Sequence, residues 1–349
     1  MNSVELTERE KSILQYVIQQ FILSASPVGS RNISKKYKLG LSPATIRNIM
    51  ADLEDSGFLQ HPHTSAGRVP TDRGYRFYVD ELMKPSPLIK SEKDKIEAFL
   101  ESTYSEPLEL LTITSTILSE LTNQLAFVTY PQIDDAVLEK VQLIKLSSSR
   151  LLVVVAIKKG IVKTITLEIN SKVDSSKLNF IEHVMNERLS GLKLAEIRKS
   201  FLERLRDIDR EELRPIIRIF FDSVDKIFSS DRKSKTPVVA GASHVIKQPE
   251  FENPENLQGI IELIESKDII IHLLENKNIK DKDFTISIGS ENENKNFTEY
   301  SFIVKEYKLD EAKGTVGIIG PKRMEYSKIV SAVLFVAESL AKEFRKTSL

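Results

Sequence analysis

The chain has 349 residues, which at roughly 150 residues per domain predicts two or three domains and excludes a single small module. Its 50 Lys and Arg side chains balance 50 Asp and Glu side chains, so only a local charge asymmetry could steer a charged partner. Cysteine is absent, which excludes disulfide scaffolds, thiolate nucleophiles and cysteine-ligated zinc. The longest purely apolar run, residues 151–157, is far short of a membrane span, and the N-terminus shows no secretory pattern. We therefore expect a cytoplasmic protein with no membrane partner.

The N-terminal segment predicts three helices in short succession, over residues 7–24, 30–37 and 43–56. Thr7 and Glu10 form a capping-box pattern at the start of the first helix. Ser30 is expected to cap the second helix, and Ser42 followed by proline to open the third. Gly57 is placed to end the third helix.

The next segment, residues 58–70, is interrupted by proline and other turn residues, which favours a small β-ribbon with Ala66 and Gly67 near its tip. A further helix is expected over residues 71–83. Prolines just beyond it mark the end of a first module at residues 1–84.

The rest of the chain mixes helical and strand-like periods. Helical patterns cover residues 91–104 and 107–125, and a strand follows at 126–130. Three alternating runs over residues 137–170 predict a three-stranded antiparallel meander, and three amphipathic helices follow. Those helices are expected at 175–190, 193–206 and 210–229, and the later elements are a strand at 237–246, helices at 254–275, strands at 284–288, 302–307 and 314–319, and a helix at 326–344. Such an order predicts a multidomain α+β protein.

Three helices followed by a ribbon is the order of a winged helix-turn-helix, whose third helix enters the major groove of DNA. The apolar side chains of the third helix are spaced to face inward, which places Thr45, Asn48 and Asp52 on the opposite face with Arg47 beside them. Asn can pair with adenine and Arg with guanine, and Thr offers a hydroxyl and a methyl group. Residues 24–79 also carry eight Lys and Arg against four Asp and Glu. The alternative is an ordinary solvated helix face.

Three other patterns are candidates for a metal site, a phosphate-binding loop and a catalytic serine. His61, His63 and Asp72 could ligate zinc, but no third histidine lies nearby, and a phosphate contact or a plain loop explains them better. The segment 317–323 lacks the ending of a phosphate-binding loop, which favours a turn between strand and helix. The pair Ser243 and His244 lacks the glycine of a nucleophile elbow. We expect no catalytic residue, metal or cofactor.

Several long motifs identify a family. Residues 42–50, 52–57 and 62–79 closely resemble the family of the heat-inducible transcription repressor HrcA, and residues 288–292 and 317–326 are similar to the same family. The resemblance implies a winged helix-turn-helix domain at 1–84 and a discontinuous GAF-like α+β domain at 85–131 and 232–349. It also implies an inserted α+β dimerisation domain at 132–231, which the meander and its helices fit.

The resemblance further implies a function. Members of the family are dimeric repressors of heat-shock chaperone operons of the groE and dnaK type. They bind an inverted-repeat operator, the CIRCE element, are released on heat stress, and are supported in activity by the GroE chaperonin. The expected partners of this chain are therefore double-stranded operator DNA, a second copy of the chain and the GroE chaperonin.

The hypothesis assigns Thr45, Arg47 and Asn48 to base edges, and Arg68 on the wing with Arg73 and Arg76 to phosphates or the minor groove. The complete set of candidate DNA-binding residues is Arg31, Lys35, Ser42, Thr45, Arg47, Asn48, His61, His63, Thr64, Gly67, Arg68, Arg73 and Arg76. Two other functions stay open at this point. A GAF-like domain could sense a small ligand, although we expect core side chains to fill its pocket, and Ser243 with His244 could hydrolyse esters.

Overall fold

The computed structural model describes most of the chain, namely residues 5–37, 40–62, 67–101, 107–158, 162–169, 174–206, 208, 213–229, 236–267, 269–271, 284–292, 294–309 and 312–347. The chain forms two compact units. The first consists of Met1–Val128, Val238–Lys305 and Val316–Leu340, and the second of Thr129–Pro237, Glu306–Thr315 and Ala341–Leu349. Both units mix helices with strands, so the protein has the α+β class that the sequence predicts.

The first unit begins with three helices, α1 (Glu8–Ser24), α2 (Ser30–Lys36) and α3 (Pro43–Asp55). The capping box of Thr7 and Glu10 opens α1, and the Ser42 side chain accepts a backbone hydrogen bond that opens α3. The expectation that Ser30 caps α2 is wrong. Gly29 holds the cap position without a side-chain bond and Ser30 is the first helical residue, because the backbone turns into the helix one residue earlier.

A short ribbon follows α3. Strand β1 (Leu59–Gln60) pairs antiparallel with β2 (Val69–Pro70). Val28, which precedes α2, joins the ribbon as well, because its N–H and C=O bond to the backbone of Arg68 at 2.8 and 2.9 Å. Of the tip expected at Ala66 and Gly67, Ala66 lies outside the described residues, as do residues 63–65.

Helix α4 (Asp72–Phe77) comes directly after the ribbon. The Thr71 side chain accepts from the Gly74 amide and so caps the helix, which continues as a π-helical turn (Tyr78–Leu82). A side chain at Gly74 would collide with the backbone carbonyl of Phe58. Glycine therefore lets α4 lie directly against the start of the ribbon.

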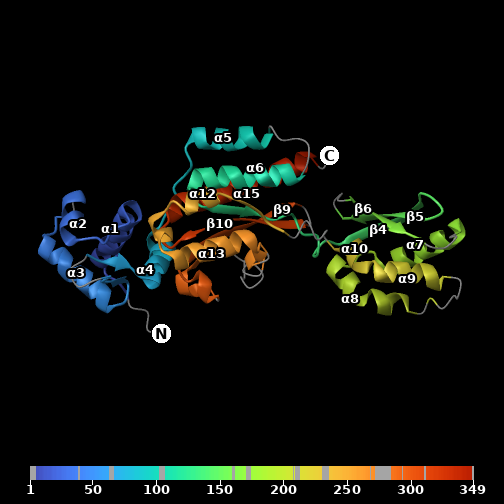
Figure 1. Ribbon diagram of the computed structural model, residues 1–349, viewed down its shortest axis with the longest axis horizontal. Helices are drawn as coiled ribbons and strands as arrows, with labels where there is room; N and C mark the ends of the chain where they lie inside the picture. The colour runs from blue at the N-terminus through green and yellow to red at the C-terminus, as the bar shows by residue number, and fades with distance from the viewer. Residues whose placement is uncertain are drawn as a thin grey trace. The chain divides into compact units, whose positions relative to one another are not determined.

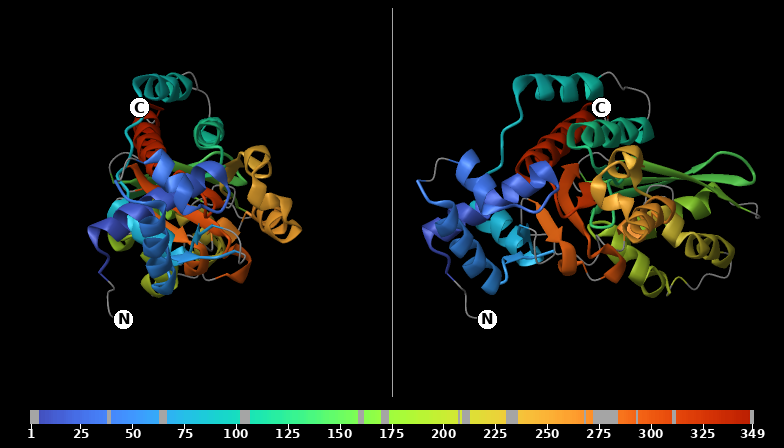
Figure 2. Two further views of the ribbon diagram at one scale, coloured as in Figure 1. Left: turned by 90° about the vertical axis from the view of Figure 1, so that its left-hand side faces the viewer. Right: turned by 60° about the vertical axis from the view of Figure 1, so that its left-hand side comes forward.

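A five-stranded sheet forms the centre of the first unit (Figure 1). Its order is β7 (Val238–Ala240), β3 (Leu125–Val128), β10 (Ala312–Pro321), β9 (Tyr300–Leu309) and β8 (Thr285–Ile288), and the registers of β7 with β3, β3 with β10 and β8 with β9 are antiparallel. Helices lie on both faces, with α6 (Pro107–Thr122) and α15 (Tyr326–Thr347) on one side and α13 (Pro254–Glu265) on the other (Figure 1). Helix α5 (Lys90–Glu101) packs on the outer side of α6 in both views of Figure 2.

The face of the sheet under α13 is filled by aromatic and aliphatic side chains. Phe127, Phe251, Phe297 and Tyr300 are buried there in one cluster with residues of α13. Core side chains therefore fill the space between this face of the sheet and α13.

One sequence expectation for the later part of the chain is wrong. The strand over residues 237–246 ends at Ala240, because Gly241 takes a φ of 94° and the short helix α12 (Ala242–Val245) follows. The helices expected over residues 254–275 are present as α13 (Pro254–Glu265) and as helical residues 269–271, and residues 268 and 272–275 lie outside the described residues. Single-turn 3-10 segments occur at Pro249–Glu252, Gly289–Glu291 and Lys295–Phe297.

The second unit contains a three-stranded antiparallel sheet, β4 (Leu138–Lys145), β5 (Arg150–Ile157) and β6 (Val162–Glu168), in that order. The side chains of β5 alternate, so that Leu151, Val153 and Val155 point into the core. Helices of this unit share that core, and they are α7 (Ser175–Leu189), α8 (Leu194–Leu205), α9 (Arg214–Asp222) and α10 (Val224–Phe228). The helix expected over residues 210–229 is broken at Ser223, between α9 and α10.

In the part of the chain that the structure describes, no helix is both long enough and apolar enough to cross a membrane.

Candidate nucleic-acid interface

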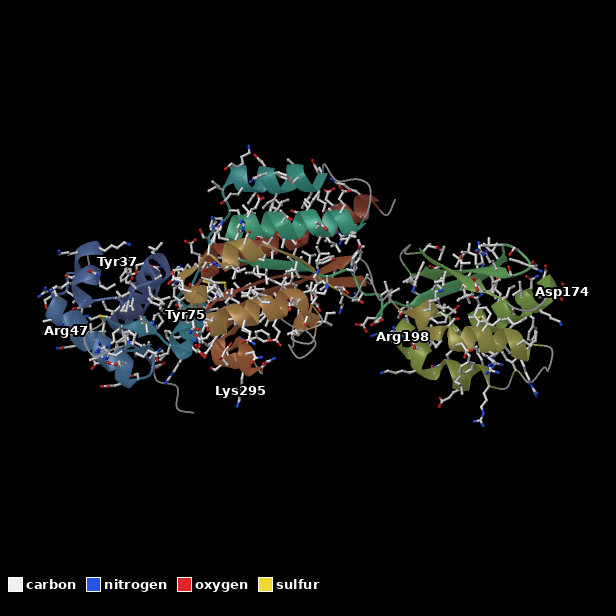
Figure 3. All side chains as sticks on the ribbon, in the orientation of Figure 1. Tyr37, Arg47, Tyr75, Asp174, Arg198 and Lys295 are labelled. Atoms are coloured by element: carbon white, nitrogen blue, oxygen red, sulfur yellow. The ribbon has the colours of Figure 1, made fainter. Side chains whose placement is uncertain are left out.

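Helix α3 presents a polar face to solvent. Ile46, Met50 and Leu53 are at most 3% exposed and hold the helix against the module, while Thr45, Arg47 and Asn48 are exposed. Figure 3 shows Arg47 at the outer edge of the module. Ser42 fixes the start of the helix, because its Oγ accepts from the Thr45 amide at 3.1 Å and lies 2.9 Å from the Thr45 hydroxyl. The exposed face is therefore carried by a helix that is anchored at its start and along its inner side.

Helix α2 adds two more exposed cations, Arg31 and Lys35. Within the described residues, no ion pair involves Arg31, Lys35 or Arg47. These three charges are thus available to a negatively charged partner, whereas ion-paired side chains would first have to give up a contact.

The candidate residues of the ribbon differ from the exposed cations of α2 and α3. A Cβ on Gly67 would collide with the backbone of Val28, so glycine at this position allows Val28 to pair with Arg68 at the start of the ribbon's second strand. Gly67 therefore has a structural role that the sequence did not reveal. The candidates His63 and Thr64 lie outside the described residues.

Arg68 is turned inward. Its Nη2 lies 2.7 Å from Glu54 Oε2, its Nη1 contacts His61 Nε2, and its side chain is only 15% exposed. His61 Nδ1 in turn lies 2.5 Å from Glu54 Oε1. The Arg68 side chain connects the ribbon to the end of α3, and any phosphate contact would compete with Glu54.

Arg73 and Arg76 are both on α4 but differ in their surroundings. Arg73 is exposed, with Nη1 donating to the Ser56 carbonyl at 2.8 Å and its guanidinium 4.4 Å from the Phe58 ring centre. Arg76 is only 29% exposed and is bound to two carboxylates, Asp80 at 3.1 Å and Glu291. Of these two arginines, only Arg73 offers an exposed guanidinium.

The structure also describes residues of the zinc site and the Ser243–His244 pair that the sequence suggested. Among the described residues, no group of three or more His, Asp or Glu side chains could hold a metal ion, and His61 faces Glu54 instead. His244 Nδ1 lies 3.2 Å from the buried hydroxyl of Ser119, so the histidine contacts a different serine from its sequence neighbour Ser243.

The glycines of the segment 317–323 serve packing. A Cβ on Gly317 would collide with Phe127, and one on Gly320 with Gln124 and Met324. The following Lys322 pairs with Asp72 and Glu299, at 3.0 and 3.2 Å. The turn expected over residues 317–323 is therefore wrong for residues 317–321, which belong to strand β10, because Gly317 and Gly320 let that strand pack closely against its neighbours.

Comparisons with known proteins identify relatives of this chain. The model of the HrcA protein C-terminal domain matches residues 108–330. The heat-inducible transcription repressor HrcA of Chlorobium phaeobacteroides (strain BS1) is 37% identical, over 97% of this chain and 98% of the relative. The protein of the same name from Chlorobaculum tepidum is 39% identical, over 98% of each. A crystal structure of a hypothetical protein has the same fold, with a TM-score of 0.57, 23% identity and coverage of 98% of this chain and 100% of that one.

These matches identify the class of protein. The relatives are transcription repressors, which act on DNA and are not enzymes. The chain belongs to the HrcA family of heat-inducible transcription repressors, since relatives of 37–39% identity cover nearly its whole length.

Proposed function

We propose that this chain is a homodimeric repressor whose residues 1–84 form a winged helix-turn-helix that reads operator DNA. In this proposal α3 enters the major groove, with Thr45, Arg47 and Asn48 at base edges. The remaining candidates position the module on the phosphate backbone of DNA or shape its wing, and they are Arg31, Lys35, Ser42, His61, His63, Thr64, Gly67, Arg68 and Arg73. Arg76 is already bound to Asp80 and Glu291 within the chain.

The observation that carries the proposal is the two-sided character of α3. Its inner side chains are buried and its outer face presents Thr45, Arg47 and Asn48 to solvent. Membership of a repressor family supplies a reason for such a face.

The proposed operator is the inverted repeat of the CIRCE element ahead of groE- and dnaK-type chaperone operons. One recognition helix reads only a few base pairs, so a two-fold dimer is needed to read two half-sites. We assign dimerisation to the inserted domain at 132–231 and a GAF-like framework to residues 85–131 and 232–349.

Control by heat completes the proposal. The GroE chaperonin supports the active fold in the cytoplasm, and heat stress draws the chaperonin away so that the repressor is released. Ordinary domains are stable by only ~5–15 kcal/mol, which makes a thermal switch physically feasible without a dedicated ligand.

The test is a salt titration of binding to an operator duplex and to a scrambled duplex of equal length, with and without chaperonin. A preference of at least ~10³ for the operator is expected of a specific binder. Equal, salt-sensitive binding to both duplexes would contradict the proposal.

Two substitutions sharpen the test. Arg47→Ala and Asn48→Ala should each cost about 1–3 kcal/mol on the operator and little on the scrambled duplex, because each removes a base contact. Lys295→Ala is the matched control, since Lys295 is an exposed cation away from α3 (Figure 3). Equal losses on both duplexes would exclude base reading by these residues.

A further inference from the structure

Helix α4 joins the N-terminal module to the sheet region within the first compact unit. The Arg76 side chain makes three of the contacts of this connection. The Nε of Arg76 donates to Glu291 Oε1 at 2.7 Å, and its Nη2 both contacts Glu291 Oε2 and donates to the Ile286 carbonyl at 2.8 Å. A two-point arginine–carboxylate contact fixes orientation as well as distance.

A second charged residue of the same helix makes a parallel connection one turn earlier. Asp72 Oδ2 accepts from the Ser290 amide at 2.8 Å, and Asp72 Oδ1 lies 3.0 Å from Lys322 Nζ. Gly289, with a φ of 56°, allows this approach, since a Cβ there would collide with the Asp72 carboxylate. We call the contacts of Asp72 and Arg76 with Ile286, Ser290, Glu291 and Lys322 the α4 interface.

The α4 interface has a counterpart at the end of α1. Arg323 Nη1 donates to the Ile22 carbonyl at 2.7 Å, while the same guanidinium binds Glu250, with Nη2 and Oε2 3.0 Å apart. The module is therefore tied to the sheet region at two separate helices. Two ties restrict rotation of the module more than either one could alone.

These ties are polar. Between them lies a cavity of about 180 Å³, lined among others by Tyr75, Glu250 and Lys322. The buried Tyr75 hydroxyl has no hydrogen-bond partner among the described residues. Polar interfaces between domains are weaker than apolar ones and allow relative motion unless specific contacts prevent it. Directional ion pairs, together with the contact between the buried rings of Tyr75 and Tyr326, whose centres lie 5.9 Å apart, are thus the means by which this boundary can hold one orientation.

We propose that Arg76 and Glu291 are positioning residues that set the orientation of the DNA-reading module and thereby the spacing between operator half-sites that the repressor accepts. The inference rests on the proposed function, because spacing has meaning only for a dimer on an inverted repeat. It reassigns Arg76 from a contact with DNA to a contact within the chain. The mechanism is pre-organisation. A module that is already held in the binding-competent orientation needs no further free energy to adopt that orientation on DNA.

The test compares Arg76→Gln, Glu291→Gln and the double substitution. Glu291→Gln breaks the pair without removing any cation, and its amide oxygen can still accept from the Ile288 amide as Glu291 does at 2.9 Å. Binding is measured on the full operator, on operators whose half-sites are moved apart by about two base pairs, roughly a fifth of a helical turn, and on a single half-site.

Both single variants should bind the full operator about tenfold more weakly, because a module that is competent about a tenth of the time binds with a correspondingly reduced affinity. They should also discriminate less between spacings, bind a single half-site like the unchanged chain, and show no additional loss when combined. Lys295→Gln should change none of these values.

Two results of these binding measurements would overturn the inference. If Arg76→Gln weakens binding to the single half-site while Glu291→Gln does not, Arg76 contacts DNA. If neither variant changes the spacing preference of a chain that binds its operator specifically, the ion pair does not position the module.

A measurement without DNA keeps this test separate from the proposed function. The chain has no cysteine, so Asp55→Cys on α3 and Gln258→Cys on α13, both exposed positions, allow a pair of spin labels. With labelled chain diluted in unlabelled chain, Glu291→Gln should broaden the label–label distance distribution, and an unchanged distribution would overturn the inference. If the chain shows no operator preference, but Glu291→Gln does broaden the label–label distance distribution, only the proposed function is contradicted.

Discussion

Helices α3 and α4 are neighbours in the same module and both carry arginine, yet the structure uses these charges in opposite ways. Arg47 on α3 is exposed and makes no ion pair among the described residues, whereas Arg76 on α4 is bound to Asp80 and Glu291. A count of cations along the chain treats them as equal. The comparison shows that a basic segment contains charges of two kinds, some offered to a partner and some already engaged within the fold.

The largest expected effect concerns the inner side of α3. Leu53 is fully buried, so Leu53→Ala should lower the free energy of unfolding by about 2–5 kcal/mol through lost burial and the cavity left behind. Asp52→Ala, on the exposed side, should stay within about 0.5 kcal/mol. Denaturant unfolding checks both, and similar losses for the two variants would show that α3 is not two-sided in the way described.

A smaller effect should separate the two arginines of α4. Arg73→Ala should reduce the dependence of log affinity on log salt by roughly 0.9 on any DNA, as expected for one lost phosphate contact, because its guanidinium is exposed. Arg76→Ala should leave the salt dependence on a single half-site unchanged. Salt titrations of both variants provide the measurement, and the reverse ranking would assign the phosphate contact to Arg76.

The smallest effect is a pH dependence of the α4 interface. Burial by itself would raise the pKa of Asp72, but hydrogen bonds from Ser290 and the charge of Lys322 outweigh it and hold the pKa below its ordinary value. A depressed pKa stabilises the fold above the unfolded-state pKa, and that contribution is lost as pH falls through the folded-state pKa.

The stability difference between the unchanged chain and Asp72→Asn should therefore be constant near neutral pH and shrink below about pH 4. Denaturant unfolding over a pH series measures it. A difference that grows toward acid would show that the Asp72 carboxylate is not stabilised by its partners.

Local signals in the sequence were sufficient for much of the architecture. Thr7 with Glu10, Ser42 before proline, and Thr71 mark the starts of α1, α3 and α4 correctly. These signals work because a cap bonds to backbone groups only two or three residues away, so the information is local. Expectations went wrong at Ser30 and after Ala240, where a glycine in the cap position and a positive φ at Gly241 changed the path of the chain.

For the candidate interface, too, some features follow from the local sequence and others from the tertiary structure. The sequence alone determined the class of fold, the family and the exposed face of α3, since helical periodicity separates Thr45 and Asn48 from the buried Ile46 and Met50.

Only the tertiary structure decided which cations are already engaged. Arg68 forms an ion pair with Glu54 across the ribbon. Arg76 binds Glu291, which lies 215 positions later in the chain. Ion pairs depend on the positions of charges in space, and no local pattern reports the partner that folding brings from so far away.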